Sequence, residues 1–537
     1  MLDAHRAPLH LIKDLWVVTG LVVRKNEYHD SVFLMRVAKR LSEQKGVLQA
    51  AALMGTEKNK GLLAEIGVSG REISAATLND LILAVKGDNQ PTIETILANI
   101  DQWLRPDLSD GAAFTIRTLD EALARQPHAN LAVISVPGAY AARETQKALE
   151  RGLNVFLFSD NVPVESERSL KEYARERGLI VMGPDCGTAI IGGIGIGFAN
   201  AVRRGPIGVI GASGTGIQEF TTLVHRAGSG TSHAIGTGSH DLSDDIGGLS
   251  FLSALEALES DEQTKVIAIL SKPPGPIVLA KLIPRIAQCP KPVVTCFLGL
   301  KKNLPYADSH YKVARTLDDA ADQAIQMATG NLPAPFNADL PNSQPLIEQE
   351  RAGKKPEQKY LRGIFAGGTF CYQAQQVLQD ASIVVHSNAP LEGNLELSNP
   401  RSSMEHTLVD MGADEFTAGR PHPMIDSSLR RERILTEARD PQVAILLLDI
   451  ILGFNSSPDP AGELASAIVA AKDEARKKGG SLSVVASMCG TEGDPQGLLQ
   501  QVKLLEEAGV VVFPSSARAA QFCGLLVANL REATDAR

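Results

Sequence analysis

The stretch IGVIGASGTG, residues 207–216, decides the fold class of this 537-residue chain. An apolar run typical of a buried strand leads into a turn of small residues, and a helical pattern follows at once. The same order recurs where GIF at 363–365 leads into AGGTF at 366–370. Each copy then carries a leucine-rich helix, an acidic turn and a second buried-strand run, at 256–270 and at 436–448. Repeated units of this kind predict paired α/β domains.

The other segments of the chain have patterns of their own. Residues 18–105 alternate strand and helix patterns and predict a small independent module. Strand patterns at 131–136, 155–158 and 179–182 alternate with helices, as in half of a Rossmann-type sheet with parallel strands. A segment rich in Pro, Asn, Gln and charge predicts a linker. We divide the chain into an N-terminal α/β module at 1–110, a Rossmann-like domain at 111–205, an α/β domain at 206–330, a linker at 331–359 and an α/β domain at 360–537.

Composition excludes several classes of partner. The net charge of -9 and the aromatic content of 4% argue against nucleic acid as the partner. The six cysteines are scattered without a CxxC pair, which favours the reducing cytosol and no structural zinc site. Lys13 and Asp14 break the apolar stretch at 9–23, so we expect neither a signal peptide nor a membrane span. The sequence predicts a cytoplasmic protein with no membrane partner and no bound metal.

The turn GASGTG offers an anion site. Ser213, Gly214, Thr215 and Gly216 would place backbone N–H groups and two hydroxyls at a helix N-terminus, where anions bind well. The turn lacks the Lys-Ser/Thr ending of a Walker A loop and the spacing of a dinucleotide fingerprint, so neither nucleoside triphosphate nor NAD binding follows from it. The alternative is a tight glycine turn without a ligand, and the sequence leaves both open.

A second glycine-rich stretch, GPDCGT at 183–188, follows a strand and precedes IIGGIGIGF. Such glycines permit close approach of the backbone to a ligand or to a neighbouring domain. Gly183, Pro184, Asp185 and Cys186 are therefore candidates for a substrate loop. No catalytic histidine with an Asn or Asp can be assigned to Cys186, so we expect a buried structural thiol and not a nucleophile.

The segment GRPHPMID at 419–426 concentrates polar groups between two prolines. Arg420 can clamp a carboxylate or phosphate, while His422 and Asp426 can transfer a proton. The alternative is that Asp426 caps a helix above a proline loop. A further cluster of acids at 241–245 can be imagined as a magnesium site, but such clusters more often favour the positive end of a helix, and we prefer that interpretation.

The chain resembles the FdrA family, distant relatives of succinyl-CoA synthetase, over nearly its whole length. The motifs that carry the resemblance are DSVFLM at 30–35, FSDNV at 158–162, MGPDCGT at 182–188, IGASGTG at 210–216, SKPP at 271–274 and GRPHPMID at 419–426. The resemblance implies that 111–205 is a Rossmann-like CoA-binding-type domain. It also implies that 206–330 and 360–537 are flavodoxin-like ligase domains of the synthetase type.

In the synthetase, an active-site histidine carries phosphate between nucleotide and acyl group, and helix N-termini of two ligase domains face it. The resemblance implies that GASGTG supplies one such N-terminus, and that Gly367, Gly368 and Thr369 of AGGTF, or a neighbouring loop, supply the other. The synthetase histidine stands in a GHAGA setting, whereas His310 stands in SHYKV, and Lys272 replaces the glutamate of a GEIGG turn. A nearby ammonium disfavours a cationic histidine, which argues against a phosphohistidine relay.

The resemblance implies a cytosolic subunit of an acyl- or carbamoyl-transfer enzyme that acts on acyl phosphates or thioesters, as in oxamate carbamoyltransferase. Arg420 would fix a carboxylate, His422 would transfer a proton, and Lys272 and Asp426 would join the substrate loop. The expected ligands are CoA, phosphate or acyl phosphate, and a small acyl or carbamoyl substrate. The expected partners are further copies or other catalytic subunits. Two alternatives stay open: an NDP-forming acyl-CoA synthetase with a phosphorylated His310 and a separate ATP-grasp chain, and a non-catalytic scaffold or ligand-sensing subunit.

Overall fold

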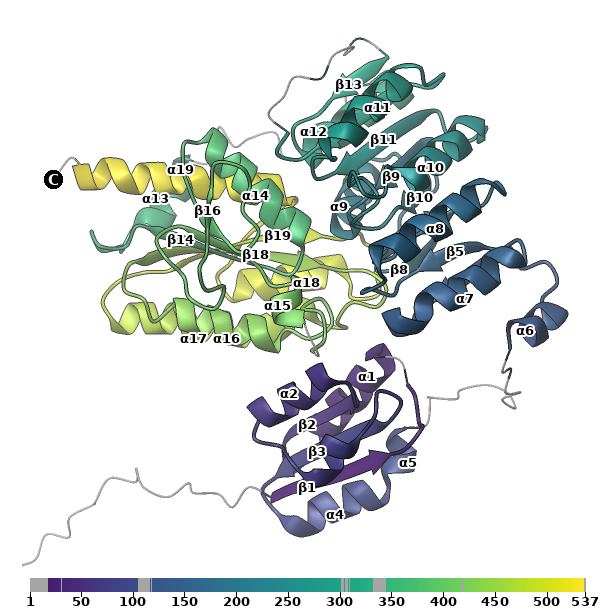
Figure 1. Cartoon of the computed structure of the whole chain (residues 1–537). Helices are drawn as coiled ribbons and strands as arrows, with labels where there is room; N and C mark the ends of the chain where they lie inside the picture. The colour runs from purple at the N-terminus through teal and green to yellow at the C-terminus, as the bar shows by residue number, and fades with distance from the viewer. Residues whose placement is uncertain are drawn as a thin grey trace, which may run out of the picture. The chain divides into compact units, whose positions relative to one another are not determined.

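A computed structural model describes residues 18–29, 31–104, 116, 118–300, 304, 308, 310–331, 344–417 and 420–535. The chain forms two compact units (Figure 1). The first contains the residues up to 117 together with 418–421, and the second contains the rest. We describe each unit by itself.

The N-terminal unit is a small α/β module, as predicted. Its antiparallel sheet has the order β1-β3-β2, so β3 lies in the centre, and every residue of β3 except Lys86 is buried. Helices pack on both faces, where Leu34 and Val37 of α1 cover one side and Leu63 of α2 and Ile73 of α3 cover the other. The elements are β1 (Val18–Arg24), α1 (Ser31–Ser42), β2 (Val47–Met54), α2 (Glu57–Glu65), α3 (Arg71–Ala75), β3 (Leu81–Gly87), α4 (Gln90–Ala98) and α5 (Ile100–Trp103).

The second unit begins with a three-stranded parallel sheet of order β4-β5-β6. Strands β4 and β6 fall inside predicted strand runs, and β5 begins one residue before the run at 155–158, which confirms the Rossmann-like alternation of this segment. The elements are α6 (Leu119–Arg125), β4 (Leu131–Ile134), α7 (Gly138–Glu150), β5 (Asn154–Leu157), α8 (Val164–Arg175) and β6 (Val181–Met182).

A seven-stranded sheet follows, with the order β13-β12-β11-β9-β10-β7-β8. Its strands β9 to β13 are parallel and have the doubly wound order 2-1-3-4-5 of flavodoxin-like folds. The glycine-rich IIGGIGIGF forms a hairpin that adds β7 and β8 to this sheet, an arrangement that we did not predict. The elements are β7 (Thr188–Ile191), β8 (Ile194–Gly197), β9 (Ile207–Gly211), α9 (Gly214–Arg226), β10 (Thr231–Gly236), α10 (Leu249–Ser260), β11 (Val266–Ser271), α11 (Pro276–Ala287), β12 (Val293–Phe297), β13 (Tyr311–Val313) and α12 (Leu317–Thr329).

The C-terminal part repeats this architecture in a parallel sheet of order β16-β15-β17-β14-β18-β19-β20. Within the predicted linker, residues 344–351 form α13, whose buried Ile347 joins the same core as α19. The elements are α13 (Gln344–Arg351), β14 (Tyr360–Phe365), α14 (Gly368–Asp380), β15 (His386–Ser387), β16 (Leu395–Glu396), β17 (Thr407–Asp410), α15 (Asp414–Thr417), α16 (Ser428–Glu437), β18 (Val443–Ile451), α17 (Pro460–Lys477), β19 (Ser483–Cys489), α18 (Leu498–Glu507), β20 (Val511–Phe513) and α19 (Ser516–Asp535).

The two large sheets share one hydrophobic core. Helices α9 and α12 cover one face of the first sheet, and α14 and α19 cover one face of the second. Phe220 of α9 and Phe370 of α14 are fully buried in the same cluster. The opposite faces have separate cores under α10 and α11 and under α16 and α17. The helix α9 directly follows β9, and α14 directly follows β14. Because these two helices pack in one core, the two predicted turns that precede them lie close together.

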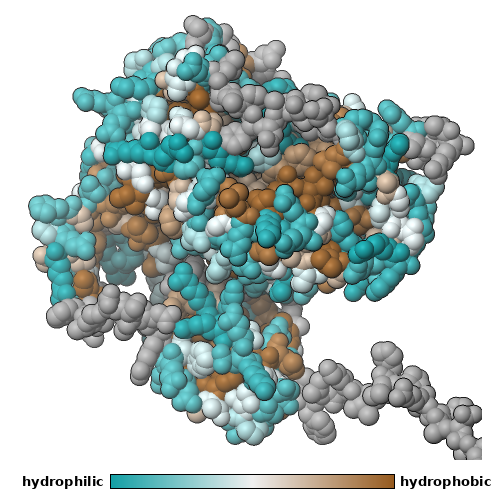
Figure 2. All heavy atoms as spheres, turned by 180° about the vertical axis from the view of Figure 1, so that it is seen from behind, coloured by the Kyte–Doolittle hydropathy of each residue, from teal (hydrophilic) through white to brown (hydrophobic). Residues whose placement is uncertain are grey.

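The surface mixes polar and apolar side chains. Figure 2 shows brown hydrophobic areas among teal hydrophilic ones on the face seen from behind. Isolated exposed apolar side chains, such as Val133 and Leu499, are normal on a folded protein. No helix among the described residues is long and apolar enough to cross a bilayer.

Candidate active site

The N-termini of α9 and α14 meet inside the second unit. Ser213 caps α9 by accepting the Gly216 N–H at 3.1 Å, and its hydroxyl also hydrogen-bonds to the hydroxyl of Thr369 in the first turn of α14. A Cβ on Gly367 would stand 3.1 Å from the Thr215 side chain. Such a contact is tighter than ordinary van der Waals distance, so glycine allows the two turns to approach each other.

Both turns follow the carboxyl end of the first strand in their sheets. In doubly wound sheets this end of the strands is where ligands bind. The first N–H groups of each helix, those of Gly214 and Thr215 and of Gly368 and Thr369, have no partner within their own helix. Unpaired N–H groups and the positive ends of two helix dipoles favour an anion at this place.

A small hollow opens beside the start of α9. Its cavity volume is about 10 Å³, against roughly 300–1,000 Å³ for sites that hold drug-sized ligands, so it admits only a very small group and not a whole CoA molecule. Ser213 and Gly214 line one side, and Asp185, Cys186 and Thr188 line the other. The two glycine-rich stretches that the sequence singled out therefore share one hollow. We derive no step through CoA from it.

The GPDCGT loop packs closely behind this hollow. A Cβ on Gly238 would stand 2.3 Å from the Pro184 carbonyl oxygen and 2.9 Å from the Gly183 Cα, so the loop lies directly on that glycine. The Cys186 thiol is buried and donates to the Thr188 carbonyl oxygen at 3.6 Å. Burial raises the pKa of Cys186 to about 12, which keeps the thiol protonated and agrees with a structural role.

A buried ion pair holds the turn before α14. The Asp449 carboxylate accepts the N–H groups of Ala366 and Gly367 at 2.8 and 2.7 Å. Arg430 donates to Asp449 Oδ1 at 2.8 Å and to the Ile364 carbonyl oxygen at 3.1 Å. Both charged side chains are at least nine-tenths buried, so a loss of either would leave an unpaired buried charge. We did not single out either residue from the sequence.

Two further charged groups lie at this edge. Asp410 ends β17, and its Oδ2 stands 2.4 Å from where a Cβ on Gly368 would be. Burial raises the pKa of Asp410 to about 6, although the Lys272 ammonium nearby acts in the opposite direction. Lys272 follows β11, is exposed, and lies 5.1 Å from the centre of the Tyr372 ring on α14. A cation from one domain thus reaches the helix start of the other.

His422 lies near Asp410 and is neutral at pH 7. A Cβ on Gly412 would stand 2.8 Å from His422 Nε2 and 3.2 Å from Asp410 Oδ1. The Met424 N–H donates to His422 Nδ1 at 3.2 Å, so the neutral ring carries its proton on Nε2. Burial, assisted by the Arg430 charge, lowers the pKa of His422 to about 4. This ring is suited to donate a hydrogen bond toward the site.

The rest of GRPHPMID does not join this group. Asp426 Oδ1 accepts the Ser428 N–H at 2.8 Å, but Ser427 and not Asp426 is the N-cap of α16, so Asp426 lies one residue before the capping position that we gave as the alternative. Arg420 is grouped with the N-terminal unit, and its role stays a prediction. Of the polar residues of this segment in the second unit, His422 is the one that lies close to the helix N-termini.

His310 lies at the other edge of its sheet. It directly precedes β13, whose Tyr311 pairs with Val293 at the start of the parallel β12. The carboxyl edge is one strand away, which is roughly 16 Å for five residues. Its Nε2 lies 3.0 Å from the Cys289 carbonyl oxygen, and the side chain is exposed. The structure does not bring His310 together with either helix N-terminus.

Two acids of the cluster at 241–245 bind helix N-termini, in agreement with the interpretation that we preferred. Asp241 accepts the N–H groups of Ser250 and Phe251 at the start of α10 and also binds Lys171 at 2.9 Å. Asp244 accepts the Ile277 and Val278 N–H groups at the start of α11. Both oxygens of Asp241 and the Oδ1 of Asp244 are therefore used by the protein itself.

Comparison with known proteins places these observations in a family. The CoA-ligase model matches residues 364–526 and the CoA-binding domain model matches 202–298. The uncharacterized protein YahF of Escherichia coli (strain K12) is 43% identical over 498 residues, which cover 92% of this chain and 96% of YahF. The chain belongs to the YahF family. The CoA-binding match falls on the segment that we predicted as a ligase domain, and not on 111–205.

More distant relatives of this YahF-family chain include subunits of succinate–CoA ligase. Succinate–CoA ligase (ADP-forming) subunit alpha 1 of Archaeoglobus fulgidus is 29% identical over 186 residues, covering 34% of this chain and 62% of that subunit. The chain thus spans less than two thirds of the length of this relative. Among solved structures, the dinucleotide forming acetyl-coenzyme A synthetase 1 of Ca. Korarchaeum cryptofilum aligns with 75% of this chain and 83% of its own at 17% identity, with a TM-score of 0.31. The FdrA name stays a prediction.

The N-terminal module matches a model described as AllF, heavy metal-associated domain, at residues 18–115. Heavy-metal sites depend on soft thiolate ligands. This range contains no cysteine and one histidine, His29. Among the described residues, no group of three His, Cys, Asp or Glu side chains is placed to hold a metal ion. The residues present do not fit a heavy-metal site, and we assign no metal chemistry to the module.

Proposed function

We propose that this chain is a subunit of an acyl-transfer enzyme that holds the phosphate of an acyl phosphate between the N-termini of α9 and α14. The observation that carries the proposal is the hydrogen bond between Ser213 and Thr369, which joins the two helix starts across two domains. The CoA-ligase and CoA-binding matches support chemistry in which an acyl group moves between a thioester and phosphate.

Each group at the site has a role in this scheme. The N–H groups of Gly214, Thr215, Gly368 and Thr369 hold the phosphate oxygens. The His422 Nε2–H donates to the acyl carbonyl oxygen, where negative charge develops during transfer. Lys272 adds a positive charge that stabilises the same anion. A carbamoyl group is the acyl group that we favour, as in oxamate carbamoyltransferase, with CoA thioesters as the wider class.

The test uses the native complex purified with its partner chains. Gly214→Asp places a carboxylate where the phosphate binds, and we expect it to abolish phosphate-dependent acyl or carbamoyl transfer. Gly214→Ala is the matched control, because it adds a side chain at the same position without a charge; its Cβ would stand 3.1 Å from the Thr188 hydroxyl. Full turnover in a folded Gly214→Asp complex would remove this site from the mechanism.

A second candidate is an acyl-CoA ligase that works with a separate ATP-grasp chain. The similarity to succinate–CoA ligase alpha subunits favours it. Mass spectrometry of the native complex would reveal a stoichiometric ATP-grasp chain, and an acid-labile phosphate on the protein would follow. Loss of that phosphate in His422→Gln but not in His310→Ala would place the relay at the helix N-termini. A complex without such a chain favours carbamoyl or acyl transfer.

A further inference from the structure

Asp410 is a nearly buried carboxylate with one free oxygen at the proposed anion site. It has 8% of its surface exposed, and its Oδ1 accepts the Gly412 N–H at 2.9 Å. Its Oδ2 receives no donor from the part of the chain that the structure describes, and it stands 2.4 Å from the Cβ position of Gly368, the first residue of α14. A negative oxygen therefore lies where the phosphate would approach.

Other charged groups around Asp410 also affect whether its carboxylate is ionised. The charged and titratable groups that face it come from several elements: Lys272 after β11, Asp449 on β18, Glu415 on α15 and His422. Lys272 favours the ionised carboxylate, whereas burial and the two acids disfavour it. His422 is neutral and contributes no charge. An oxyanion bound at α14 would add a further like charge at close range, which disfavours ionisation again.

We propose that Asp410 takes up one proton on Oδ2 each time an oxyanion binds at the N-termini of α9 and α14. The proton comes from solvent, and no other bond forms or breaks. The neutral carboxyl then donates its O–H to the anion, so repulsion is replaced by a hydrogen bond. This inference deepens the proposed function and rests on it. The chemical consequence is that the site binds anion and proton together and holds that proton next to the reacting phosphate.

Sulfate is the probe for the test, because it keeps its charge across the pH range in which a carboxyl of this kind titrates. Isothermal titration calorimetry of the full chain is run in two buffers that differ in ionisation enthalpy. We expect uptake of nearly one proton per sulfate at about pH 8, and an affinity that falls about tenfold per pH unit between about pH 7 and 9. Asp410→Asn should bind sulfate without proton uptake, and on the order of 100-fold more tightly at about pH 8.

A matched control removes a carboxylate from the opposite end of the same helix. Asp380 is the last residue of α14 and lies roughly 18 Å from its start. Asp380→Asn should leave the proton uptake unchanged. Sulfate binding without proton uptake, or the same uptake in Asp410→Asn, would overturn this inference and leave the anion site standing. A complete lack of saturable sulfate binding would overturn both. Proton-linked binding without acyl transfer in any complex would instead remove the proposed function alone.

Discussion

The hydroxyls of Ser213 and Thr369 form a hydrogen bond between the first turns of α9 and α14, which belong to two different sheets. Because Ser213 also caps its own helix, one side chain both terminates α9 and fixes its distance from α14. The proposed anion site therefore depends on the packing of two domains and not on one loop.

A double-mutant cycle should measure this coupling. Ser213→Ala removes the cap and should cost about 1 kcal/mol in the free energy of unfolding. Thr369→Val keeps the shape and removes only the hydroxyl. We expect the two changes together to cost about 1 kcal/mol less than the sum of the single changes, because both remove the same hydrogen bond. Urea unfolding followed by circular dichroism gives the values, and strict additivity would show that the hydroxyls do not interact.

Gly368 should tolerate no side chain while Asp410 is present. Its Cβ would stand 2.4 Å from Asp410 Oδ2, so Gly368→Ala must displace the carboxylate and should cost roughly 1–3 kcal/mol of stability. The double variant Gly368→Ala/Asp410→Ala should recover part of this loss. Gly524→Ala on α19 is the control, because its Cβ would meet Ala381 at an ordinary 3.5 Å. The unfolding midpoints of the wild-type chain and the three variants test this prediction. Equal losses of stability in Gly368→Ala and Gly524→Ala would contradict the clash.

The fold could be predicted because its signals are local. An apolar run followed by a small-residue turn needs only neighbouring residues to specify a strand and a helix start, so α9 and α14 begin where the motifs placed them. The glycines of IIGGIGIGF serve two purposes. Gly192 and Gly193 have φ of 59° and 87° and form the turn of the β7–β8 hairpin, which we did not predict. The Gly197 carbonyl oxygen accepts from Asn455 of the C-terminal domain at 2.8 Å, which is the close approach to a neighbouring domain that we expected.

The site could be predicted only in part, because its other members depend on strand order. Strand β14 lies between β17 and β18, so Asp410 and Asp449 flank the start of α14 although they are far apart in the sequence. No local pattern reveals which strands are neighbours in a sheet of seven. His310 shows the converse case. Its distance along the chain suggested the active edge, but the short β13 begins directly after it and places it at the amino edge.

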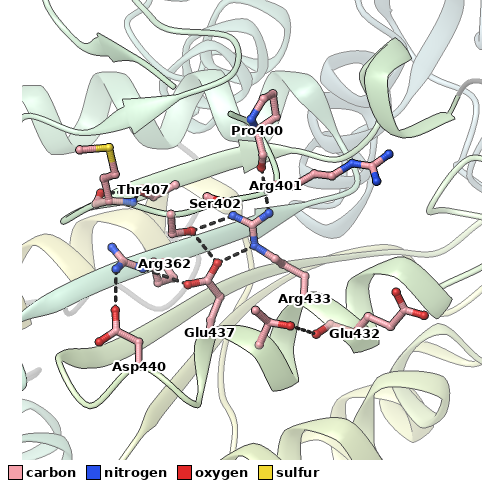
Figure 3. A network of polar contacts seen from close by, with 12 residues as sticks. Arg362, Pro400, Arg401, Ser402, Thr407, Glu432, Arg433, Glu437 and Asp440 are labelled. Carbon is pink, nitrogen blue, oxygen red and sulfur yellow. Dashed lines mark hydrogen bonds and ion pairs between the residues drawn. The ribbon is translucent and has the colours of Figure 1, made fainter. Parts of the chain in front are cut away.

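A buried ionic network should be a large contributor to the stability of the C-terminal domain (Figure 3). Glu437 accepts from Arg362 at 3.0 Å and from Arg433 at 2.5 Å, and Ser403 donates to it as well. Glu437→Gln leaves the buried Arg433 guanidinium without a carboxylate and Arg362 with Asp440 alone, and should cost roughly 3–5 kcal/mol. The exposed Glu432 lies on the same helix, and Glu432→Gln should change stability by less than about 0.5 kcal/mol. Similar losses of stability in both variants would show that the buried network contributes no more than an exposed carboxylate does.

Acid should destabilise the C-terminal domain partly through His406. Its Nδ1 accepts the Leu361 N–H, and burial together with the Arg531 charge lowers its pKa to about 4. The unfolded chain binds a proton below about pH 6.5 that the folded chain refuses until about pH 4, so stability falls as pH drops through this window. His406→Gln should flatten this part of the profile by up to about 3 kcal/mol. Urea midpoints between about pH 7 and 4 test it, and an unchanged slope would assign the effect to other groups.

Lys272 should strengthen anion binding, since its ammonium reaches over the start of α14 from the facing domain. Lys272→Gln should weaken sulfate binding about fivefold, the effect of roughly 1 kcal/mol for an exposed charge, and should reduce the salt dependence of the affinity. Lys265 provides a control with the same change of charge. It precedes β11, whereas Lys272 follows it, so Lys265→Gln alters the opposite edge of the sheet. Equal weakening by both substitutions would mean that net charge, and not the position of Lys272, governs the affinity.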